Sequence, residues 1–332
     1  MSAAAEIVFR NVTKRYTGRS RAAVHDLSLT IPAGEICVLV GPSGAGKTTA
    51  MKLVNRLIDL DEGEITIDGR SIRELDATEL RRGIGYVIQQ VGLFPHMSVG
   101  DNVAVVPRLL GWERKRIRDR VAQLLELVGL EDGDRDRYPS QLSGGQRQRV
   151  GLARALAADP PVMLMDEPFG ALDPITRHRL QNEFLRLHGA VRKTVIFVTH
   201  DIDEAIKLGD RIAILREGGV LAQYDTPDAI LAAPADEFVA RFVGADRGLK
   251  RLALRRLSEL DLEPADVDDA GAPRLDSSTT LRDALSLMLS AGSPRCVVVD
   301  SQGNVLGTLS IERVSDLLWD EVGGRKLDGA PV

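Results

Sequence analysis

The sequence is poor in cysteine, in aromatic residues and in long apolar runs, and the first and the last of these shortages each exclude a class of protein. Its 332 residues include only two cysteines, Cys37 and Cys296, each within an apolar stretch. This predicts buried free thiols in a reducing compartment and no disulfide framework. Aromatic residues make up only 4% of the chain, but 44% apolar residues are enough for a sizeable core. No apolar run approaches the roughly 20 residues that a membrane-spanning helix needs.

An excess of positive charge is also missing. The formal net charge of −5 argues against a nucleic-acid-binding chain, because phosphate backbones require a basic surface. The first residues, Met-Ser-Ala-Ala-Ala-Glu, lack the charged start and the long apolar segment of a secretion signal. We therefore expect any role at a membrane to depend on a partner.

One stretch carries the pattern of a phosphate-binding loop. Residues 41–49 read Gly-Pro-Ser-Gly-Ala-Gly-Lys-Thr-Thr. Residues 36–40 read as a buried strand and residues 49–54 as the start of a helix, which is the context that this motif needs. We expect Lys47 to contact the β- and γ-phosphates and the Thr48 hydroxyl to bind Mg²⁺. The alternative is a glycine-rich turn with a chance lysine.

Two further motifs suit the chemistry of a bound phosphate chain. Asp166 and Glu167 follow an apolar run. We expect Asp166 to hold the coordination shell of Mg²⁺, and Glu167 to polarise the attacking water or accept its proton. The alternative is a surface carboxylate pair. Residues 142–146, Leu-Ser-Gly-Gly-Gln, precede a helical pattern, and small residues at a helix start suit an anionic group. Taken alone, this motif would be only a helix cap.

Apolar and alternating stretches predict an α/β fold. Alternation over residues 6–16 and 23–31, with a short strand at residues 62–68, predicts an antiparallel patch. Residues 98–157 show mostly helical periodicity. Continuous apolar runs, which are typical of parallel core strands, occur at residues 84–90, 162–165, 194–198 and 211–215.

The composition changes after the predicted nucleotide-binding body, which we expect to cover residues 1–244. Residues 245–276 contain a basic, leucine-rich stretch and then an acidic stretch with two prolines, and they are predicted to be a linker. Residues 277–322 predict a compact unit with the order helix, strand, strand, helix. Residues 323–332 are predicted to be a disordered tail.

In their order along the chain, these motifs resemble those of the ATP-binding subunits of ABC transporters. The phosphate loop, Gln89, residues 142–146, residues 162–167, the Ala-Leu-Asp of residues 171–173 and His200 occur in the family's order within residues 6–244. The resemblance implies a P-loop ABC ATPase fold with a mainly parallel core sheet, an antiparallel β subdomain and a helical subdomain. It also implies a head-to-tail dimer with two ATP molecules between the subunits.

The resemblance further implies a role for individual residues. Tyr16 would stack on adenine, although a surface tyrosine is the alternative. Gln89 would contact Mg²⁺ and the attacking water and report to the permease. Asp173 would brace the dimer, and His200 would contact the γ-phosphate. The implied catalytic residues are Glu167, His200, Lys47 and Gln89, and the implied Mg²⁺ ligands are Thr48, Gln89 and Asp166. The implied nucleotide-binding residues are Tyr16, Gly41, Pro42, Ser43, Gly44, Ala45, Gly46, Lys47, Thr48, Thr49, Asp173 and, from the other subunit, Ser143, Gly144, Gly145 and Gln146.

Three stretches narrow the resemblance to one kind of transporter. Residues 51–58, 85–97 and 199–210 resemble the ATPases that drive import of quaternary-amine osmoprotectants, namely glycine betaine, carnitine, choline and proline betaine. The residues after Gln89 are where such subunits contact the permease. Residues 279–309 resemble a CBS module, which these ATPases often carry in tandem. In this sequence only one CBS module is recognisable, and residues 250–276 would have to supply a degenerate first module.

The implied partners are a second copy of the chain, an integral membrane permease and an extracellular solute-binding protein, with this subunit on the cytoplasmic face of the cell membrane. Other ABC importers, such as those for amino acids or methionine, remain an alternative. So do a soluble ABC ATPase that is not coupled to transport and a regulatory nucleotide-binding module with little turnover.

The basic stretch at residues 247–257 allows a regulatory hypothesis. Arg247, Lys250, Arg251, Arg255 and Arg256 could meet anionic lipid and release it at high salt, because salt screens such attraction. The alternative is a solvated charged face beside the C-terminal unit.

Overall fold

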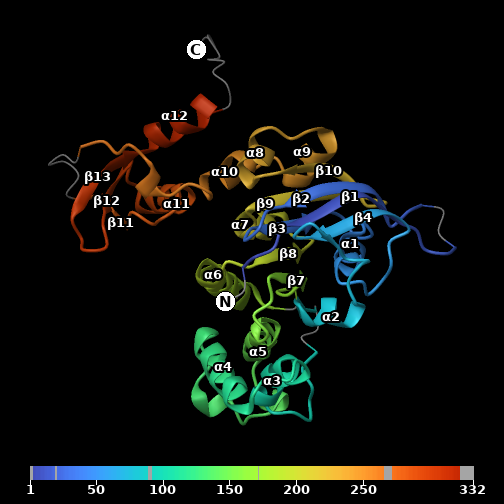
Figure 1. Cartoon of the computed structure of the whole chain (residues 1–332). Coiled ribbons are helices and arrows are strands. Elements are labelled where there is room, and N and C mark those ends of the chain that lie inside the picture. The colour runs from blue at the N-terminus through green and yellow to red at the C-terminus, as the bar shows by residue number, and fades with distance from the viewer. Residues whose placement is uncertain (1–2, 19–20, 89–91, 171, 265–270, 322–332) are drawn as a thin grey trace. The chain divides into compact units, whose positions relative to one another are not determined.

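The computed structural model describes residues 3–18, 21–88, 92–170, 172–264 and 271–321 (Figure 1). The chain packs into two compact units, residues 1–226 and residues 227–332. Each unit has its own hydrophobic core. Among the described residues, none of the helices combines the length and the apolar character that a membrane-spanning helix needs.

A six-stranded sheet forms the centre of the first unit, with the strand order β10-β9-β3-β8-β7-β6. Its strands are β3 (Ile36–Val40), β6 (Ile84–Val87), β7 (Val162–Asp166), β8 (Thr194–Val198), β9 (Arg211–Arg216) and β10 (Val220–Asp225). All neighbours pair in parallel except β9 and β10. Strands β3 and β8 are buried along their whole length, as expected for a parallel sheet that is covered on both faces. The prediction of parallel core strands is confirmed.

A second sheet of four antiparallel strands has the order β2-β1-β4-β5. Its strands are β1 (Ile7–Lys14), β2 (Val24–Ile31), β4 (Glu62–Ile67) and β5 (Arg70–Ser71). Buried residues of both sheets belong to one core cluster, for example Ile7 and Leu39. Cys37 lies in this cluster, and burial raises the pKa of its thiol to about 12, which keeps the thiol protonated and unreactive.

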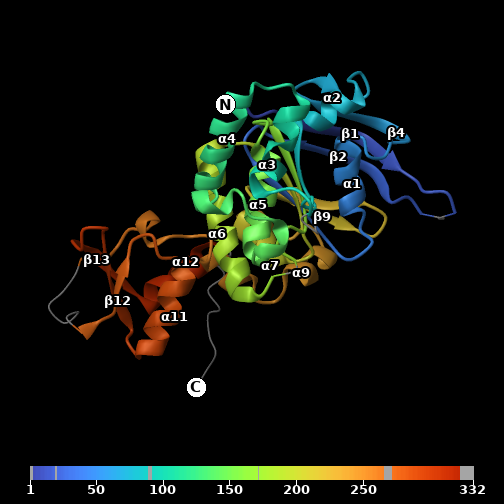
Figure 2. The ribbon, with the colours of Figure 1, turned by 90° about the horizontal axis from the view of Figure 1, so that it is seen from below.

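The helices of the first unit are α1 (Lys47–Val54), α2 (Ala77–Arg82), α3 (Val99–Leu109), α4 (Arg114–Leu127), α5 (Gly144–Leu156), α6 (Pro174–Val191) and α7 (Ile202–Leu208). Several of them begin at a capping side chain that the sequence supplies. Ser98, Ser143, Asp173 and Asp201 each accept a hydrogen bond from a backbone N–H in the first turn of the helix that follows. Helices α3, α4 and α5 pack on one another as a helical group beside the sheet (Figure 2). This confirms the predicted helical region at residues 98–157.

The second unit contains the predicted order helix, strand, strand, helix. Its elements are α8 (Pro227–Ala232), α9 (Glu237–Val243), α10 (Arg247–Leu252), the 3-10 turn η3 (Leu257–Glu259), β11 (Arg274–Asp276), α11 (Leu281–Ala291), β12 (Arg295–Val299), β13 (Val305–Ser310) and α12 (Ile311–Glu321). The strands form a sheet in the order β11-β12-β13. Cys296 is buried in this unit and free, as predicted.

The predicted linker turns out to contain ordered structure. Strand β11 pairs in parallel with β12, and Leu257 and Leu275 join the core of this unit. The sequence did not reveal the strand because it spans three residues with one apolar side chain.

The division between the two units falls after Thr226, which is before the boundary expected near Gly244. Helix α8 belongs to the second unit because it packs on α10, where Arg251 Nε lies 2.9 Å from Asp228 Oδ1. The domain boundary at residue 244 stays a prediction, and residues 323–332 lie outside the described part.

The predicted basic face does not form as a single surface. Lys250 and Arg251 are each 8% exposed. Lys250 Nζ donates a hydrogen bond to the carbonyl oxygen of Val243, and Arg251 pairs with Asp228. The hypothesis of five lipid-facing cations is therefore wrong for these two residues, because their charges are already matched within the unit.

We expect Leu257→Ala to destabilise the second unit by about 2–5 kcal/mol, because Leu257 is fully buried in its core. The matched variant Leu289→Ala should change stability by less than about 0.5 kcal/mol, since Leu289 is 64% exposed. Hydrogen exchange of the amides in β12 and β13 measures both effects on the full chain. Equal exchange in the two variants would show that residues 257–276 do not stabilise this unit.

Candidate functional site

The phosphate loop closes at positions that only glycine can occupy. Gly41 and Gly46 have φ angles of 153° and 81°. A Cβ on Gly41 would lie 2.2 Å from the carbonyl oxygen of Leu215, and one on Gly46 would lie 2.0 Å from that of Ala23. The loop therefore connects the buried strand β3 to the N-terminus of α1 by a path that side chains would block, as the sequence motif predicted.

The Lys47 side chain lies inside this loop and is 7% exposed. Its Nζ donates hydrogen bonds to the carbonyl oxygens of Gly41 and Pro42, at 2.7 and 3.0 Å. Burial lowers the pKa of Lys47, and the nearby carboxylates of Glu167 and Asp166 oppose that shift. A cation is thus held at the start of the helix, where the backbone N–H groups of α1 also favour an anion.

Thr48 and Asp166 meet at the edge of the sheet. Strands β3 and β7 both pair in parallel with β8, so their carboxyl ends point to the same edge. The Thr48 hydroxyl donates a hydrogen bond of 3.0 Å to Asp166 Oδ1. Burial raises the pKa of Asp166, an effect that the Thr48 hydrogen bond opposes and that the charge of Glu167 increases. A hydroxyl and a carboxylate oxygen are hard donors of the kind that Mg²⁺ prefers.

Glu167 and His200 form the other half of the site. His200 Nδ1 lies 3.3 Å from Glu167 Oε1, and the two side chains are 62% and 23% exposed. Glu167 has a φ angle of 43°, in the left-handed region that glutamate rarely adopts, which costs about 1–3 kcal/mol. Its N–H donates a hydrogen bond of 2.9 Å to the carbonyl oxygen of Val198, which helps to hold this conformation. A strained backbone that aims a carboxylate at a histidine marks Glu167 as a functional residue.

Residues 143–146 form a helix start with an open N-terminus. Ser143 Oγ accepts a hydrogen bond from the N–H of Gln146, while Gln146 Oε1 accepts one from the N–H of Ser143. Among the described residues, and apart from its own helix and neighbours, no heavy atom lies within 4 Å of the place where a Cβ on Gly144 would stand. The helix N-terminus is thus open at Gly144, where the backbone can approach an anion.

The remaining predicted residues lie apart from this cluster. Tyr16 is 36% exposed, and Lys14 Nζ lies 5.9 Å from the centre of its ring. Asp173 caps α6, and the hydrogen bond from the Thr176 N–H lowers the pKa of its carboxyl. No hydrogen bond or ion pair in the described part of the chain joins residues 143–146 or Asp173 to the phosphate loop. Gln89 lies outside the described residues, so its predicted role stays untested.

Nothing in the sequence pattern pointed to Asn102, a fully buried residue that holds residues 94–98. Asn102 Oδ1 accepts a hydrogen bond from the N–H of Phe94, and Nδ2 donates to the carbonyl oxygens of Phe94, Met97 and Ser98. These bonds fix a loop on which the Phe94 side chain is 40% exposed. An asparagine on the buried face of a helix reveals such a role only when its backbone partners are known.

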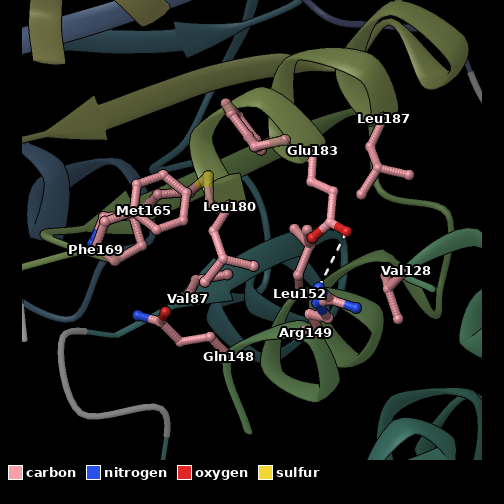
Figure 3. Close-up of a pocket in the computed structure, with 12 residues that line it drawn as sticks. Val87, Val128, Gln148, Arg149, Leu152, Met165, Phe169, Leu180, Glu183 and Leu187 are labelled. Carbon is pink, nitrogen blue, oxygen red and sulfur yellow. Dashed lines mark ion pairs between the residues drawn. The ribbon is translucent and has the colours of Figure 1, made fainter. Parts of the chain in front are cut away.

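A small apolar pocket behind the carboxylate pair was also missed (Figure 3). Met165 and Phe169, which flank Asp166 and Glu167 in sequence, line it together with Leu180 of α6. Arg149 and Glu183 form an ion pair of 3.1 Å among its lining residues (Figure 3). Residues of α5, which Ser143 caps, and of β7, which ends at Asp166, both line the pocket.

Comparison with known proteins identifies the family. Residues 24–170 match the family model described as ABC transporter. The osmoprotectant import ATP-binding protein OsmV of Salmonella typhimurium is 48% identical over 307 residues, covering 91% of this chain and 78% of that protein. The glycine betaine uptake system ATP-binding protein YehX of Escherichia coli is 47% identical, covering 92% of this chain and 98% of that protein. This chain belongs to the ATP-binding subunits of ABC transporters.

Solved structures of ABC cassettes support the same conclusion. A dimeric ABC transporter cassette superposes with a TM-score of 0.59 at 37% identity, covering 67% of this chain and 98% of the cassette. A post-hydrolysis structure of that cassette holds ADP and Pi and has a TM-score of 0.58 at 36% identity. The predicted family, fold class and ATP-hydrolysing activity are therefore confirmed. Cassettes of this family bind ATP and form dimers.

Proposed function

We propose that this ABC subunit hydrolyses ATP to power the import of quaternary-amine osmoprotectants through a membrane permease. The catalytic half of the proposal rests on one observation, the convergence of Lys47, Thr48, Asp166, Glu167 and His200 at the carboxyl edge of the six-stranded sheet. The solute class rests on similarity. The relatives include OpuBA of Bacillus subtilis, a choline transport ATP-binding protein that is 48% identical, and a trimethylamine N-oxide transport protein of Ruegeria pomeroyi that is 41% identical.

The phosphate loop binds and orients the nucleotide. Backbone N–H groups of the loop and of the first turn of α1 point toward the phosphates, and Lys47 adds a positive charge at the same place. Bound Mg²⁺ would supply charge neutralisation between the phosphates, held by Thr48 and Asp166. No cluster of three His, Cys, Asp or Glu side chains gathers in the described residues. The phosphates, water and Gln89 would therefore complete the metal's oxygen ligands.

Glu167 and His200 act on the water that attacks the γ-phosphate. The Glu167 carboxylate accepts a proton from this water or polarises it, and the His200 imidazole holds the water and the γ-phosphate in line. Little covalent chemistry is required of the protein, because phosphoryl transfer depends mainly on positioning and on stabilisation of charge. His200 Nδ1 and Glu167 Oε1 lie 3.3 Å apart, which is close enough for one water molecule to contact both side chains.

The active form is a head-to-tail dimer on the cytoplasmic face of the membrane. Ser143, Gly144 and Gly145 of one subunit complete the nucleotide site of the other. This accounts for the open space beside Gly144, and for the finding that no hydrogen bond or ion pair in the described residues joins this turn to its own phosphate loop. Asp173 braces this dimer, and Tyr16 stacks on the adenine. The loop held by Asn102 contacts the permease, and an extracellular solute-binding protein delivers the solute. Residues 277–322, within the second unit, are a CBS-like module that regulates the ATPase.

We expect cells that express this chain with its permease to take up labelled glycine betaine, choline, carnitine or trimethylamine N-oxide, and not a control amino acid. The Glu167→Gln variant should abolish this uptake, because transport depends on ATP turnover. Glu79→Gln is the matched control, since Glu79 is exposed on α2 away from the site. Uptake of the amino acid alone would replace the osmoprotectant proposal with an amino-acid importer and would leave the ATPase assignment intact.

A further inference from the structure

A buried polar cluster lies between α6 and α7, beside the catalytic pair. Glu204, in the first turn of α7, is 6% exposed, and Gln181 of α6 is 5% exposed. Gln181 Nε2 donates a hydrogen bond of 2.9 Å to Glu204 Oε1. Burial raises the pKa of the Glu204 carboxyl group, while the Thr199 hydroxyl and the Gln181 amide beside it lower that pKa. Burying a carboxyl group costs free energy unless the group is hydrogen-bonded, so Glu204 depends on its polar neighbours to stay buried here.

The cluster reaches His200 through Thr199. Thr199 Oγ1 accepts a hydrogen bond of 3.1 Å from the N–H of Asp201, so a tight turn closes around His200. A hydroxyl has one hydrogen, and Thr199 therefore donates to Glu204 while it accepts from Asp201. Asp201 Oδ1 in turn accepts from the N–H of Glu204 at 3.3 Å. The backbone on both sides of His200 is thus tied to the start of α7.

A second link joins this turn to the start of α6. Arg177 Nη2 donates a hydrogen bond of 3.1 Å to the carbonyl oxygen of Leu172, and its Nη1 lies 3.8 Å from Asp201 Oδ2. Gln181 stands one turn further along the same helix. Helix α6 begins at its cap Asp173, the residue expected to brace the dimer. The contact from Arg177 to Asp201 therefore connects the first turn of α6 with the turn that carries His200, and Gln181 connects the same helix with the start of α7.

We propose that Glu204 is a positioning residue for ATP hydrolysis: it anchors the turn at residues 199–201 to α6, so that the His200 imidazole stays beside Glu167. His200 is the exposed member of the pair, so the turn beneath it determines where the imidazole points. Glu167, His200 and Glu204 line the same small cavity. This inference rests on the ATPase activity in the proposed function and adds residues that orient its catalytic histidine.

Steady-state ATP hydrolysis by the purified full chain tests the proposal. Glu204→Ala and Thr199→Val should each lower kcat by about tenfold to a hundredfold, because a small misplacement of a catalytic group has effects of this size. The KM for ATP should change by less than about threefold, since the phosphate loop that binds the nucleotide is untouched. Glu204→Gln and Thr199→Ser should restore most of the rate, because the amide oxygen still accepts a hydrogen bond and the serine hydroxyl still donates one.

Leu180→Ala separates positioning from loss of packing. Leu180 is on α6, 5% exposed, and lines the apolar pocket of Figure 3 without belonging to the polar cluster. We expect this variant to be destabilised but to keep its kcat at a temperature where it is folded. An unchanged kcat in Glu204→Ala, an equal loss in Leu180→Ala, or no rescue by Glu204→Gln would each overturn the positioning role. A wild-type chain without ATP turnover would overturn the proposed function itself.

Discussion

Glu167→Gln is expected to reduce ATP hydrolysis by about a hundredfold or more while ATP still binds. The substitution removes the basic oxygen of the only carboxylate that the described residues place against His200, and general-base catalysis typically contributes about 10²–10⁴-fold. Glutamine has the same shape, and it is no worse than glutamate in the left-handed conformation at φ 43°. The backbone bond from residue 167 to Val198 is also kept. The loss should therefore appear in kcat and not in folding or affinity.

Three measurements on the same variant separate these effects. Steady-state hydrolysis gives kcat, equilibrium binding of ATP gives affinity, and the mass in solution with ATP reports the dimer. We expect ATP affinity within about twofold of the wild type and a dimer that persists, because the bound nucleotide is no longer consumed. Hydrolysis close to the wild-type rate would assign the base to another group. Loss of both binding and hydrolysis would instead give Glu167 a structural role at its strained position.

The catalytic cluster could be predicted from the sequence because its chemistry depends on short, local motifs. The glycines at 41 and 46, the lysine after them and the carboxylates at the end of an apolar strand are each readable within a few residues, and parallel pairing through β8 then brings them together. The strain at Glu167 is also local, but no residue type signals it. A glutamate is an unusual choice for that backbone conformation, so only the structure reveals it.

The supporting contacts could not be predicted, because they join residues that are distant in sequence. Gln181 and Glu204 are ordinary polar residues until the packing of α6 on α7 buries both side chains together. Strand β11 forms because it pairs with β12 and because its Leu275 side chain is buried in the core. A stretch of three residues indicates neither of these contacts. The basic stretch at 247–257 suggested a surface, but Asp228, which pairs with Arg251, comes from a helix that precedes it.

Lys47→Met is expected to abolish productive ATP binding, with kcat/KM falling by about a hundredfold or more. Methionine keeps the length and the apolar stem of lysine, so the variant removes mainly the ammonium group. That group is 7% exposed and lies in a loop whose other phosphate donors are backbone N–H groups. Bulk water screens it weakly, and its attraction for a phosphate is correspondingly larger than that of a surface lysine.

The structure also predicts the direction of the stability change in Lys47→Met. Burial lowers the pKa of Lys47, which means that the folded state disfavours its charged form before a nucleotide arrives. Removing the ammonium group relieves this cost, but it also removes the hydrogen bonds from Nζ to the carbonyl oxygens of Gly41 and Pro42. We therefore expect the nucleotide-free variant to be slightly less stable than the wild type, by about 1–2 kcal/mol. ATP should raise the melting temperature of the wild type and not that of the variant, because a ligand stabilises only a protein that binds it.

Lys115→Met on the exposed surface of α4 controls for the change in net charge and should respond to ATP as the wild type does. A variant that ATP still stabilises fully would show that the backbone of the loop alone carries the affinity and that Lys47 serves only the transition state.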